Sequence, residues 1–600
     1  MPTQELIDTP EKYAEAKRYI NERDDDLVMD TETNGLDFIK NRMVGTWLLS
    51  GERAFYLPFR HAEGRNLPEP LIRDMCSDIL RKDRVQVGYH YGFDVKMMRK
   101  EGMALPDRFE DAMLRAHVLN ENEDSFKMED IASKYVDPQA GEAEERLVDM
   151  LQGRFGGARS TAKSNLWRLS GAETLEYGTQ DLITTRELRD FQASHLESWE
   201  LSGIAVEVED FQRTIAEVEI GGCHIDRHRL ATSGDYAARK EKQLEGEIQA
   251  LAGYKLNPRS PKQLKAWLGS TNTKRETLEA LADSDPRAQM VLDYRAWQKV
   301  DGTYYRPIAM HLDPDGRVHP NLRVTGTVAG RLSCQTIALQ GIPRAAADTE
   351  SPYYGVKRLF AAPEGMSLIE LDLAQAEIVL MAHYSRDPKL LEILAKGLSM
   401  HDVVAAEQGV PRPVAKALNF SAQYGIGADA FAANYGYSRR ESEAYLQGYH
   451  QLFGGVQSFM SQCTRIARAR GYVRTWTGRA RHFNSPRAKL HSAGNNVIQG
   501  GIACAMRRAM PEIHRLVPEL RQCLSVHDSV LGYAPTAQAE EIARAAAHIM
   551  AEQFDGWCST EIHVARTLGP LAAYRSPICD SASDQDPRPA ASRRPSCGPS

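Results

Sequence analysis

Apolar and polar residues alternate from Ser367 to Leu371, and the pattern then changes to apolar residues at helical spacing. Such an alternation is typical of a strand that enters a core. The helical spacing is carried by Ala376, Val379, Leu380 and His383. The change predicts that Asp372 lies where a strand passes into a helix. Further along, residues 524–531 predict a strand, a tight polar turn that includes Asp528, and a returning strand.

Asp372 and Asp528 are therefore candidates for one shared chemical site. Two aspartates on neighbouring strand ends could hold two Mg²⁺ ions, which is the arrangement that in-line phosphoryl transfer uses. An isolated aspartate at a strand end is also often a helix cap or a turn former. Neither residue is decisive alone.

The stretch between these aspartates carries two cations and then two rings at intervals of four residues, namely Arg412, Lys416, Phe420 and Tyr424. At about 100° per residue, all of them fall on one helix face about 120° wide. Such a face suits a triphosphate at one end and a base and sugar at the other. A helix with snorkelling charges and two core rings is the alternative interpretation.

The first part of the chain predicts a second group of acids. Residues 27–32 predict a strand on which Asp30 and Glu32 share a face, and these carboxylates repel each other unless a cation or a proton lies between them. The other members are Asp94, Asp181 and Tyr177, which precedes Asp181 by one helical turn. Any one of these acids could be an ordinary surface carboxylate, whereas four in this order favour a functional site.

Composition limits the class of protein. Six hundred residues allow about three or four domains, and 42% hydrophobic content is ordinary for a globular protein. The net charge of −7 gives no global basic field, but residues 463–489 carry eight Lys or Arg and no acid. This segment is either a phosphate-contacting strip or a solvated helix face. Nine scattered cysteines and the lack of a signal peptide or membrane-spanning run predict a cytoplasmic protein without a zinc site.

The three central stretches resemble motifs A, B and C of the family A DNA polymerases. The matching patterns are D-x-x-Q-x-E at 372–377, R-x-x-x-K-x-x-N-F-x-x-x-Y-G at 412–425 and V-H-D at 526–528. The resemblance implies two Mg²⁺ ions, replaceable by Mn²⁺, on Asp372, Asp528 and the carbonyl of Leu373. It also implies nucleotide binding by Arg412, Lys416, Phe420, Tyr424, Gln375, Glu377 and His527. Lys416 would also protonate the leaving pyrophosphate, and Glu377 would exclude a 2′-hydroxyl.

Two further regions are similar to DNA-contacting elements of the same family. Residues 325–343 are similar to T-G-R-L-S-S followed by N-L-Q-N-I-P, and residues 495–500 are similar to N-x-P-[IV]-Q-G. The resemblance implies DNA contacts by Arg331, Gln340, Asn495 and Gln499. The sequence departs from the family at Ala338, Gly341, His491, Val497 and Ser529. Because Ser529 replaces a carboxylate that often follows motif C, Asp372 and Asp528 are left as the two essential metal ligands.

The acids of the first part resemble the DEDDy 3′–5′ exonucleases, whose pattern is D-x-E, then F-D, then Y-x-x-x-D. The resemblance implies that Asp30, Glu32, Asp94 and Asp181 bind two Mg²⁺ ions while Tyr177 orients the attacking water. His90 stands where this family usually has Asn. We interpret the polar, Gly-rich residues 120–170 as a loop insertion within this domain.

The resemblances together imply a multidomain fold of α/β and α+β type, with an RNase H-like domain followed by a right-hand polymerase. The expected boundaries are 1–195 for the exonuclease domain, 196–300 for a helical thumb, 301–394 and 486–574 for the palm, 395–485 for the fingers, and 575–600 for a disordered tail. The thumb carries an element similar to N-P-x-S-P-K-Q-L at residues 257–264.

These features predict a DNA-templated DNA polymerase with 3′–5′ proofreading. Its expected partners are primer-template DNA and dNTPs, and we expect a monomer without membrane contact. Because no 5′-nuclease domain precedes Asp30, the prediction is a phage-type replicase rather than a repair enzyme. A single-subunit RNA polymerase is an alternative, against which Glu377 and the exonuclease acids argue. A non-catalytic DNA-binding scaffold and a translesion polymerase are further alternatives, which would more often have lost metal ligands or exonuclease acids.

Overall fold

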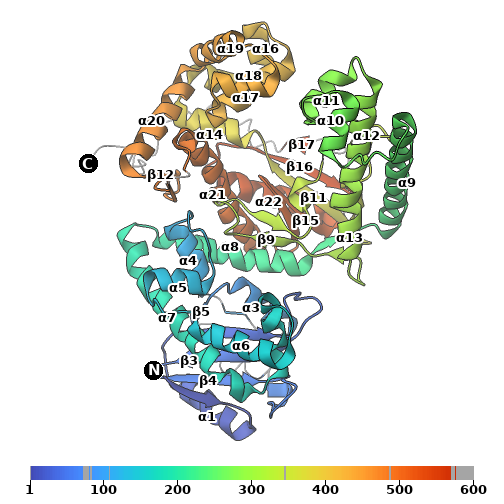
Figure 1. Cartoon of the computed structure of the whole chain (residues 1–600). Helices are drawn as coiled ribbons and strands as arrows, with labels where there is room; N and C mark the ends of the chain where they lie inside the picture. The colour runs from blue at the N-terminus through green and yellow to red at the C-terminus, as the bar shows by residue number, and fades with distance from the viewer. Residues whose placement is uncertain are drawn as a thin grey trace. The chain divides into compact units, whose positions relative to one another are not determined.

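The computed structural model (Figure 1) describes residues 2–568 and 574–575, with gaps at 72–73, 75–79, 81–83, 104, 107, 344–345 and 486–487. Two compact units are present. The first comprises residues 1–220 together with 477–482, and the second comprises the rest of the chain. The expected disordered tail lies almost entirely outside the described residues. Among the residues described, no helix is both long and apolar enough to span a membrane.

The first unit is built on a mixed six-stranded sheet. Its order is β1 (Thr3–Leu6), β4 (Arg53–Pro58), β3 (Met43–Ser50), β2 (Leu27–Thr33), β5 (Gln86–Gly88) and β6 (Phe109–Asp111). β2 pairs antiparallel with β3 and parallel with β5, so the strand that carries Asp30 and Glu32 is internal to the sheet. The helices are α1 (Pro10–Asn21), α3 (Gly92–Lys100), α4 (Ala112–Leu119), α5 (Met128–Tyr135), α6 (Glu142–Phe155), α7 (Leu175–Ser198) and α8 (Ser202–Gly221).

The interpretation of residues 120–170 as a loop insertion is wrong. This segment forms α5, α6 and a 3-10 helix, η1 (Arg159–Arg168). The physical reason is that the buried α6 residues Leu147, Val148 and Leu151 recur at helical spacing and pack in one core cluster with Ala162 and Leu166 of η1. The expected boundary at residue 195 also differs from the division at residue 220, because most of α8 belongs to the first unit.

The second unit contains an antiparallel sheet that brings distant segments together. Its order is β14 (Arg521–Val526), β15 (Ser529–Pro535), β11 (Met366–Leu373), β16 (Thr560–Ala565) and β17 (Tyr574–Arg575). The strand predicted before Asp372 and the strand–turn–strand predicted around Asp528 are both confirmed. In β11, Ile369, Leu371 and Leu373 are buried and alternate with Glu370 and Asp372 on the opposite face.

The remaining elements of the second unit are mostly helical. Before the sheet come α9 (Arg227–Ala252), α10 (Pro261–Leu268), α11 (Arg275–Ala282), α12 (Pro286–Val300) and α13 (Arg306–Met310). After β11 come α14 (Ala376–Ser385), α15 (Pro388–Ala395), α16 (Met400–Gln408), α17 (Arg412–Tyr424), α18 (Ala428–Tyr435), α19 (Arg439–Leu452), α20 (Gly454–Arg470), α21 (Ala493–Leu516) and α22 (Ala539–Glu552). Its short strands are β7 (Cys223–His224), β8 (Arg317–Val318), β9 (Asn321–Arg323), β10 (Ser333–Gln335) and β12 (Tyr472–Arg474), whereas β13 (Ala480–His482) belongs to the first unit.

Candidate functional site

Asp372 and Asp528 lie at neighbouring ends of β11 and the β14–β15 hairpin. The backbone N–H of Leu373 donates to the carbonyl of Asp528 at 3.2 Å, and Asp372 is paired with Ser529 in the strand register. The tight turn between β14 and β15 places His527 in the left-handed region, with φ of 58°. The fold therefore brings together two carboxylates that are separated by more than 150 positions in the sequence.

Burial disfavours the ionised forms of Asp372 and Asp528 unless a cation lies beside them. Burial and, to a smaller extent, the negative charges of Asp528, Glu370 and Glu561 together raise the pKa of Asp372 to about 7. Burial also raises the pKa of Asp528, and Arg331 opposes that shift. Carboxylates that repel in this way are the oxygen donors that Mg²⁺ prefers, so the residues present fit a divalent-cation site.

Glu377, in the first turn of α14, is the centre of a polar network beside the aspartates. Its Oε1 lies 3.3 Å from Nη2 of Arg331 and accepts a hydrogen bond from Nε2 of Gln499. Gln340 donates from Nε2 to the Ser525 carbonyl on β14 at 3.2 Å. The structure therefore places three of the four expected DNA-binding residues in polar contacts at this place.

Two further residues of the predicted site lie at the start of α14 and within α21. Gln375 immediately precedes α14 with φ of 55°, and Asn495 is buried within α21. Sequence reasoning missed Arg507, which is 2% exposed and donates to the Gly330 carbonyl at 2.9 Å. Because Gly330 precedes Arg331, this buried guanidinium fixes the backbone that presents Arg331. The available signal was that Cys504 and Met510, three residues to either side of Arg507 on the same helix, are apolar.

The predicted helix over 412–424 is confirmed as α17. Arg412 is exposed and its Nε lies 2.6 Å from Oδ1 of Asp402, and Nζ of Lys416 lies 5.8 Å from the centre of the Phe420 ring. Phe420 is 39% exposed, which leaves the ring accessible. The side chain of Tyr424 lies outside the part of the chain that the structure describes.

Two arginines of the basic segment 463–489 contact other side chains of the protein. Arg479, within the first unit, is only 3% exposed and lies 3.2 Å from the His117 ring. Arg481 lies 2.7 Å from Oε1 of Glu121. These two cations pair with protein groups in this structure, so the interpretation of the whole segment as one phosphate-contacting strip is not supported at these positions.

The second group of acids lies in the first unit. Glu32, on β2, is 9% exposed, and Asp94, on α3, is 3% exposed. Asp94 accepts hydrogen bonds from the N–H of Thr31 at 3.0 Å and from its hydroxyl at 2.5 Å. Because Thr31 lies between Asp30 and Glu32, these bonds fix α3 beside the strand that carries both acids.

Helix α7 supplies Tyr177 and Asp181. The helix approaches the sheet closely because Gly178 has no side chain: a Cβ there would lie 2.0 Å from Cε2 of Trp47 on β3. Burial raises the pKa of Asp181 well above its usual range, with Asp30 acting in the same direction and Lys163 opposing it. Burial likewise raises the pKa of Asp30 to about 6.

Lys163 is a residue of this site that sequence reasoning missed. Its Nζ donates to the Tyr177 hydroxyl at 2.7 Å and lies 3.3 Å from Oε1 of Glu144. Although burial disfavours the cation, the charges of Asp181, Glu144 and Glu32 raise the pKa of Lys163. No local pattern identifies this lysine, because η1 brings it to the site from an otherwise polar stretch.

Glu32 shows that the site fits a metal. Burial raises its pKa to about 8, with Asp30 adding to the shift and Lys163 opposing it. Its Oε1 is buried without a hydrogen-bond partner among the described residues. A buried carboxylate oxygen that has no hydrogen-bond partner suits coordination by a hard cation.

Comparison with known proteins identifies the family. The family described as "DNA polymerase family A" matches residues 227–570. The chain belongs to DNA polymerase family A. The matched residues of this family A chain include all three polymerase motifs, at 372–377, 412–425 and 526–528.

Individual relatives are similar over most of the family A chain. It is 27% identical to DNA polymerase I of Pseudomonas aeruginosa over 84% of its length, and 30% identical to the thermostable DNA polymerase I of Thermus aquaticus over 75%. It spans only 59% and 54% of those two proteins. The fold is similar to the POL domain of Pol1 from M. smegmatis in complex with DNA primer-template and dNTP, with a TM-score of 0.77 at 20% identity, covering 92% of this chain and 98% of that one.

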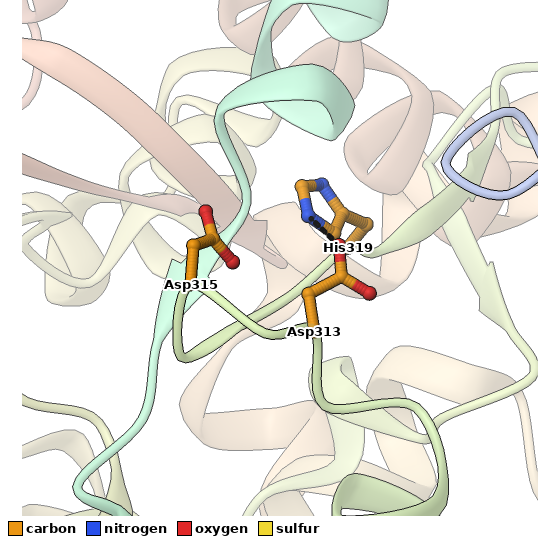
Figure 2. A group of neighbouring side chains, drawn as sticks. All are labelled: Asp313, Asp315 and His319. Atoms are coloured by element: carbon orange, nitrogen blue, oxygen red, sulfur yellow. Dashed lines mark ion pairs between the residues drawn. The ribbon is translucent and has the colours of Figure 1, made fainter.

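A separate group of possible metal ligands flanks β8, with two aspartates before the strand and a histidine directly after it (Figure 2). Asp313, Asp315 and His319 are the only three potential ligands among the described residues whose donor atoms all lie within 4.8 Å of one another. Nε2 of His319 lies 3.0 Å from Oδ2 of Asp313, and Arg317 lies 3.2 Å from Asp315. Arg317 already balances the charge of Asp315, and the His319 ring already contacts Asp313. Among the described residues, no three acids of either predicted site bring their donor atoms within that distance of one another.

Proposed function

We propose that this chain is a DNA-templated DNA polymerase that extends a primer 3′ end with dNTPs. The observation that supports the proposal is the hydrogen bond from the Leu373 N–H to the Asp528 carbonyl, which joins the end of β11 to the β14–β15 turn in a chain of family A. Asp372, Asp528 and the Leu373 carbonyl would hold two Mg²⁺ ions. When bound, these ions lower the pKa of the primer hydroxyl and bind the triphosphate.

The residues of the chain have distinct tasks in this proposal. The primer 3′-oxygen forms a bond to the α-phosphorus of the dNTP, and the bond to pyrophosphate breaks. Arg412 and Lys416 neutralise the leaving pyrophosphate, and Lys416 donates a proton to it. Phe420 stacks on the incoming base, together with Tyr424. Glu377 lies below the sugar and excludes a 2′-hydroxyl.

We also propose a 3′–5′ exonuclease in the first unit. The supporting observation is the convergence of Asp30, Glu32 and Asp94 with Asp181 on α7. These acids would hold two Mg²⁺ ions, which activate water for attack on a phosphodiester. Tyr177 would orient that water, and Lys163 would hold the Tyr177 hydroxyl in place through the 2.7 Å hydrogen bond.

One experiment tests both proposals. A primer with a mismatched 3′ end is incubated with template, Mg²⁺ and dNTPs, and the products are separated by length. The wild type is expected to trim and then extend. Asp30→Ala/Glu32→Ala is expected to extend without trimming, and Asp372→Ala to trim without extending. Extension by Asp372→Ala at the wild-type rate would contradict the polymerase assignment.

Two finer points need their own measurements. A single-subunit RNA polymerase would incorporate rNTPs in preference to dNTPs in the same assay, whereas Glu377 predicts the opposite preference. The prediction of a phage-type replicative role is tested by strand displacement and processive synthesis on a long primed single-stranded template. Dissociation after a few nucleotides would favour a repair role instead.

A further inference from the structure

Glu144 on α6 is linked to Tyr177 on α7 through the ammonium group of Lys163. Oε1 of Glu144 lies 3.3 Å from Nζ of Lys163, and that Nζ donates to the Tyr177 hydroxyl at 2.7 Å. The same Nζ lies 4.7 Å from the centre of the Tyr177 ring. Three elements of the first unit, α6, η1 and α7, therefore supply one continuous chain of contacts from a carboxylate to a phenol.

An apolar cluster fixes the backbone on which these three side chains are carried. Leu151 of α6, Leu166 of η1 and the ring of Tyr177 are buried members of this cluster. Close packing leaves little freedom to shift one of these elements against the others. The long side chain of Lys163 is itself 42% exposed, so polar contacts rather than packing decide where its ammonium group lies.

Glu144 is the ionised member of a pair of neighbouring acids. Burial, together with a hydrogen bond to Glu144, raises the pKa of Glu129 to about 7. Burial also opposes the ionised form of Glu144, but Glu129 and Lys163 outweigh it and hold the pKa of Glu144 below its usual range. Glu144 therefore presents a negative charge to Lys163 at neutral pH.

Lys163 also experiences the attraction of acids that belong to the proposed metal site. Burial opposes its charge, but Asp181, Glu144 and Glu32 each raise its pKa. Asp181 and Glu32 are proposed metal ligands. A lysine that moved toward them would compete with a divalent cation for their charge and would no longer donate to Tyr177. Glu144 is the acid in this set that attracts Lys163 without being a proposed metal ligand.

We propose that Glu144 is a positioning residue of the 3′–5′ exonuclease site, which keeps Lys163 on the Tyr177 hydroxyl and away from the metal-binding acids. The proposal rests on the proposed exonuclease function and adds α6 to the elements that build that site. Because Tyr177 orients the attacking water, Glu144 acts through Lys163 on kcat for trimming and not on binding of the primer end.

The test compares Glu144→Gln, which keeps the size of the side chain and removes its charge, with Glu144→Asp, which keeps the charge. Glu145→Gln is the matched control, because Glu145 is an exposed acid at the next position of α6. Each change is made in the full chain, with and without Tyr177→Phe. Trimming of a mismatched 3′ end is measured with Mg²⁺ and without dNTPs, and melting curves report folding.

A second readout does not depend on activity. In EDTA, the rate at which acetic anhydride acetylates Lys163 is followed by mass spectrometry of its peptide. A lysine released from a carboxylate loses its proton more readily and reacts faster. We expect this rate to rise about two- to fivefold in Glu144→Gln, which is the range for one lost ion pair. Glu145→Gln should leave the rate unchanged.

We expect Glu144→Gln to lower kcat for trimming about fivefold without changing KM for the primer end. Glu144→Asp should recover part of kcat, and Glu144→Gln should cause little further loss in the Tyr177→Phe background. The proposal is overturned by equal kcat in Glu144→Gln and Glu145→Gln, by an undiminished loss in that background, or by an unchanged acetylation rate of Lys163. A wild type that does not trim would instead overturn the exonuclease function itself.

Discussion

The guanidinium of Arg331 lies 3.3 Å from the carboxylate of Glu377, and the same carboxylate oxygen accepts a hydrogen bond from Gln499. Two residues expected to contact DNA are therefore held by the acid expected to lie under the sugar of the incoming nucleotide. Glu377 contacts both Arg331 and Gln499, and in the proposed polymerase it would also occupy the space that a 2′-hydroxyl would need.

The first prediction concerns Glu377→Ala. Removing the side chain opens space beside the sugar, so we expect the preference for dNTP over rNTP, measured as the ratio of kcat/KM in single-nucleotide primer extension, to fall about 10- to 100-fold. Arg331 and Gln499 also lose a partner, so kcat with dNTP should fall. Glu377→Gln, which keeps the volume, should preserve sugar discrimination. An unchanged ratio in Glu377→Ala would contradict the role in sugar selection.

The second prediction concerns Arg412. Its 2.6 Å contact with Asp402 is solvent-exposed on both sides, and such pairs contribute about 0–1 kcal/mol to stability. Arg412→Ala should therefore leave the melting temperature unchanged while raising KM for dNTP about tenfold or more. Asp402→Ala should leave KM unchanged or lower it, because it releases Arg412. Arg439→Ala, which removes an exposed cation of α19, is the matched control for net charge.

The third prediction concerns Phe420, whose ring is accessible on α17. Phe420→Tyr adds a hydroxyl that can replace the 3′-hydroxyl missing from a dideoxynucleotide. Chain termination should then become more efficient, by on the order of tenfold, the value of one hydrogen bond to a charged group. Termination is compared by gel with equal dNTP and ddNTP mixtures. Equal ddNTP sensitivity of the wild type and the variant would refute the assignment of Phe420 to the nucleotide site.

The strand that ends after Asp372, the hairpin around Asp528 and helix α17 were all predictable from sequence. Each depends on a local period, two residues for a strand and 3.6 for a helix, which short segments display completely. The α6 helix was missed because the glycines around it favoured a loop, although Leu147 and Leu151 had helical spacing.

The contact of Lys163 with Tyr177 and the position of Glu561 could not be predicted from sequence because they depend on tertiary placement. The position of Glu561 beside Asp372 follows from the register between β11 and β16, which are nearly 190 residues apart. Lys163 reaches Tyr177 only because η1 packs against α6. A local sequence pattern shows neither the register between β11 and β16 nor the packing of η1 against α6.

The fourth prediction concerns Lys163→Met, which keeps the length of the side chain and removes its charge. If Lys163 positions Tyr177, kcat for trimming a mismatched 3′ end should fall about 10- to 100-fold, while primer extension remains at the wild-type level. Lys163→Arg, which can still donate to Tyr177, should retain more trimming than Lys163→Met. The decisive readout is the Tyr177→Phe background: there, Lys163→Met should cause little further loss. A full additional loss would show that Lys163 acts independently of the Tyr177 hydroxyl.

The last prediction concerns the pH dependence of stability in the first unit. In the folded chain, burial raises the pKa of Asp30 to about 6 and that of Glu32 to about 8, above the values of about 4 expected for the unfolded chain. Between those values the folded state binds more protons than the unfolded state, so the free energy of unfolding falls as pH rises. In EDTA, the calorimetric melting temperature of the first unit should therefore decrease from pH 5 to pH 8.

Mg²⁺ or Mn²⁺ should reduce this decrease, because a cation stabilises the ionised carboxylates of the folded state at high pH. Asp30→Asn/Glu32→Gln supplies the control: it removes both titrating groups, so its melting temperature should depend less on pH in EDTA and respond less to added metal. Glu52→Gln, which changes an exposed acid of the same unit, should behave as the wild type. A wild-type melting temperature that rises from pH 5 to pH 8 in EDTA would mean that these acids are ionised without difficulty in the folded chain, and the argument for a cation between them would lose its electrostatic basis.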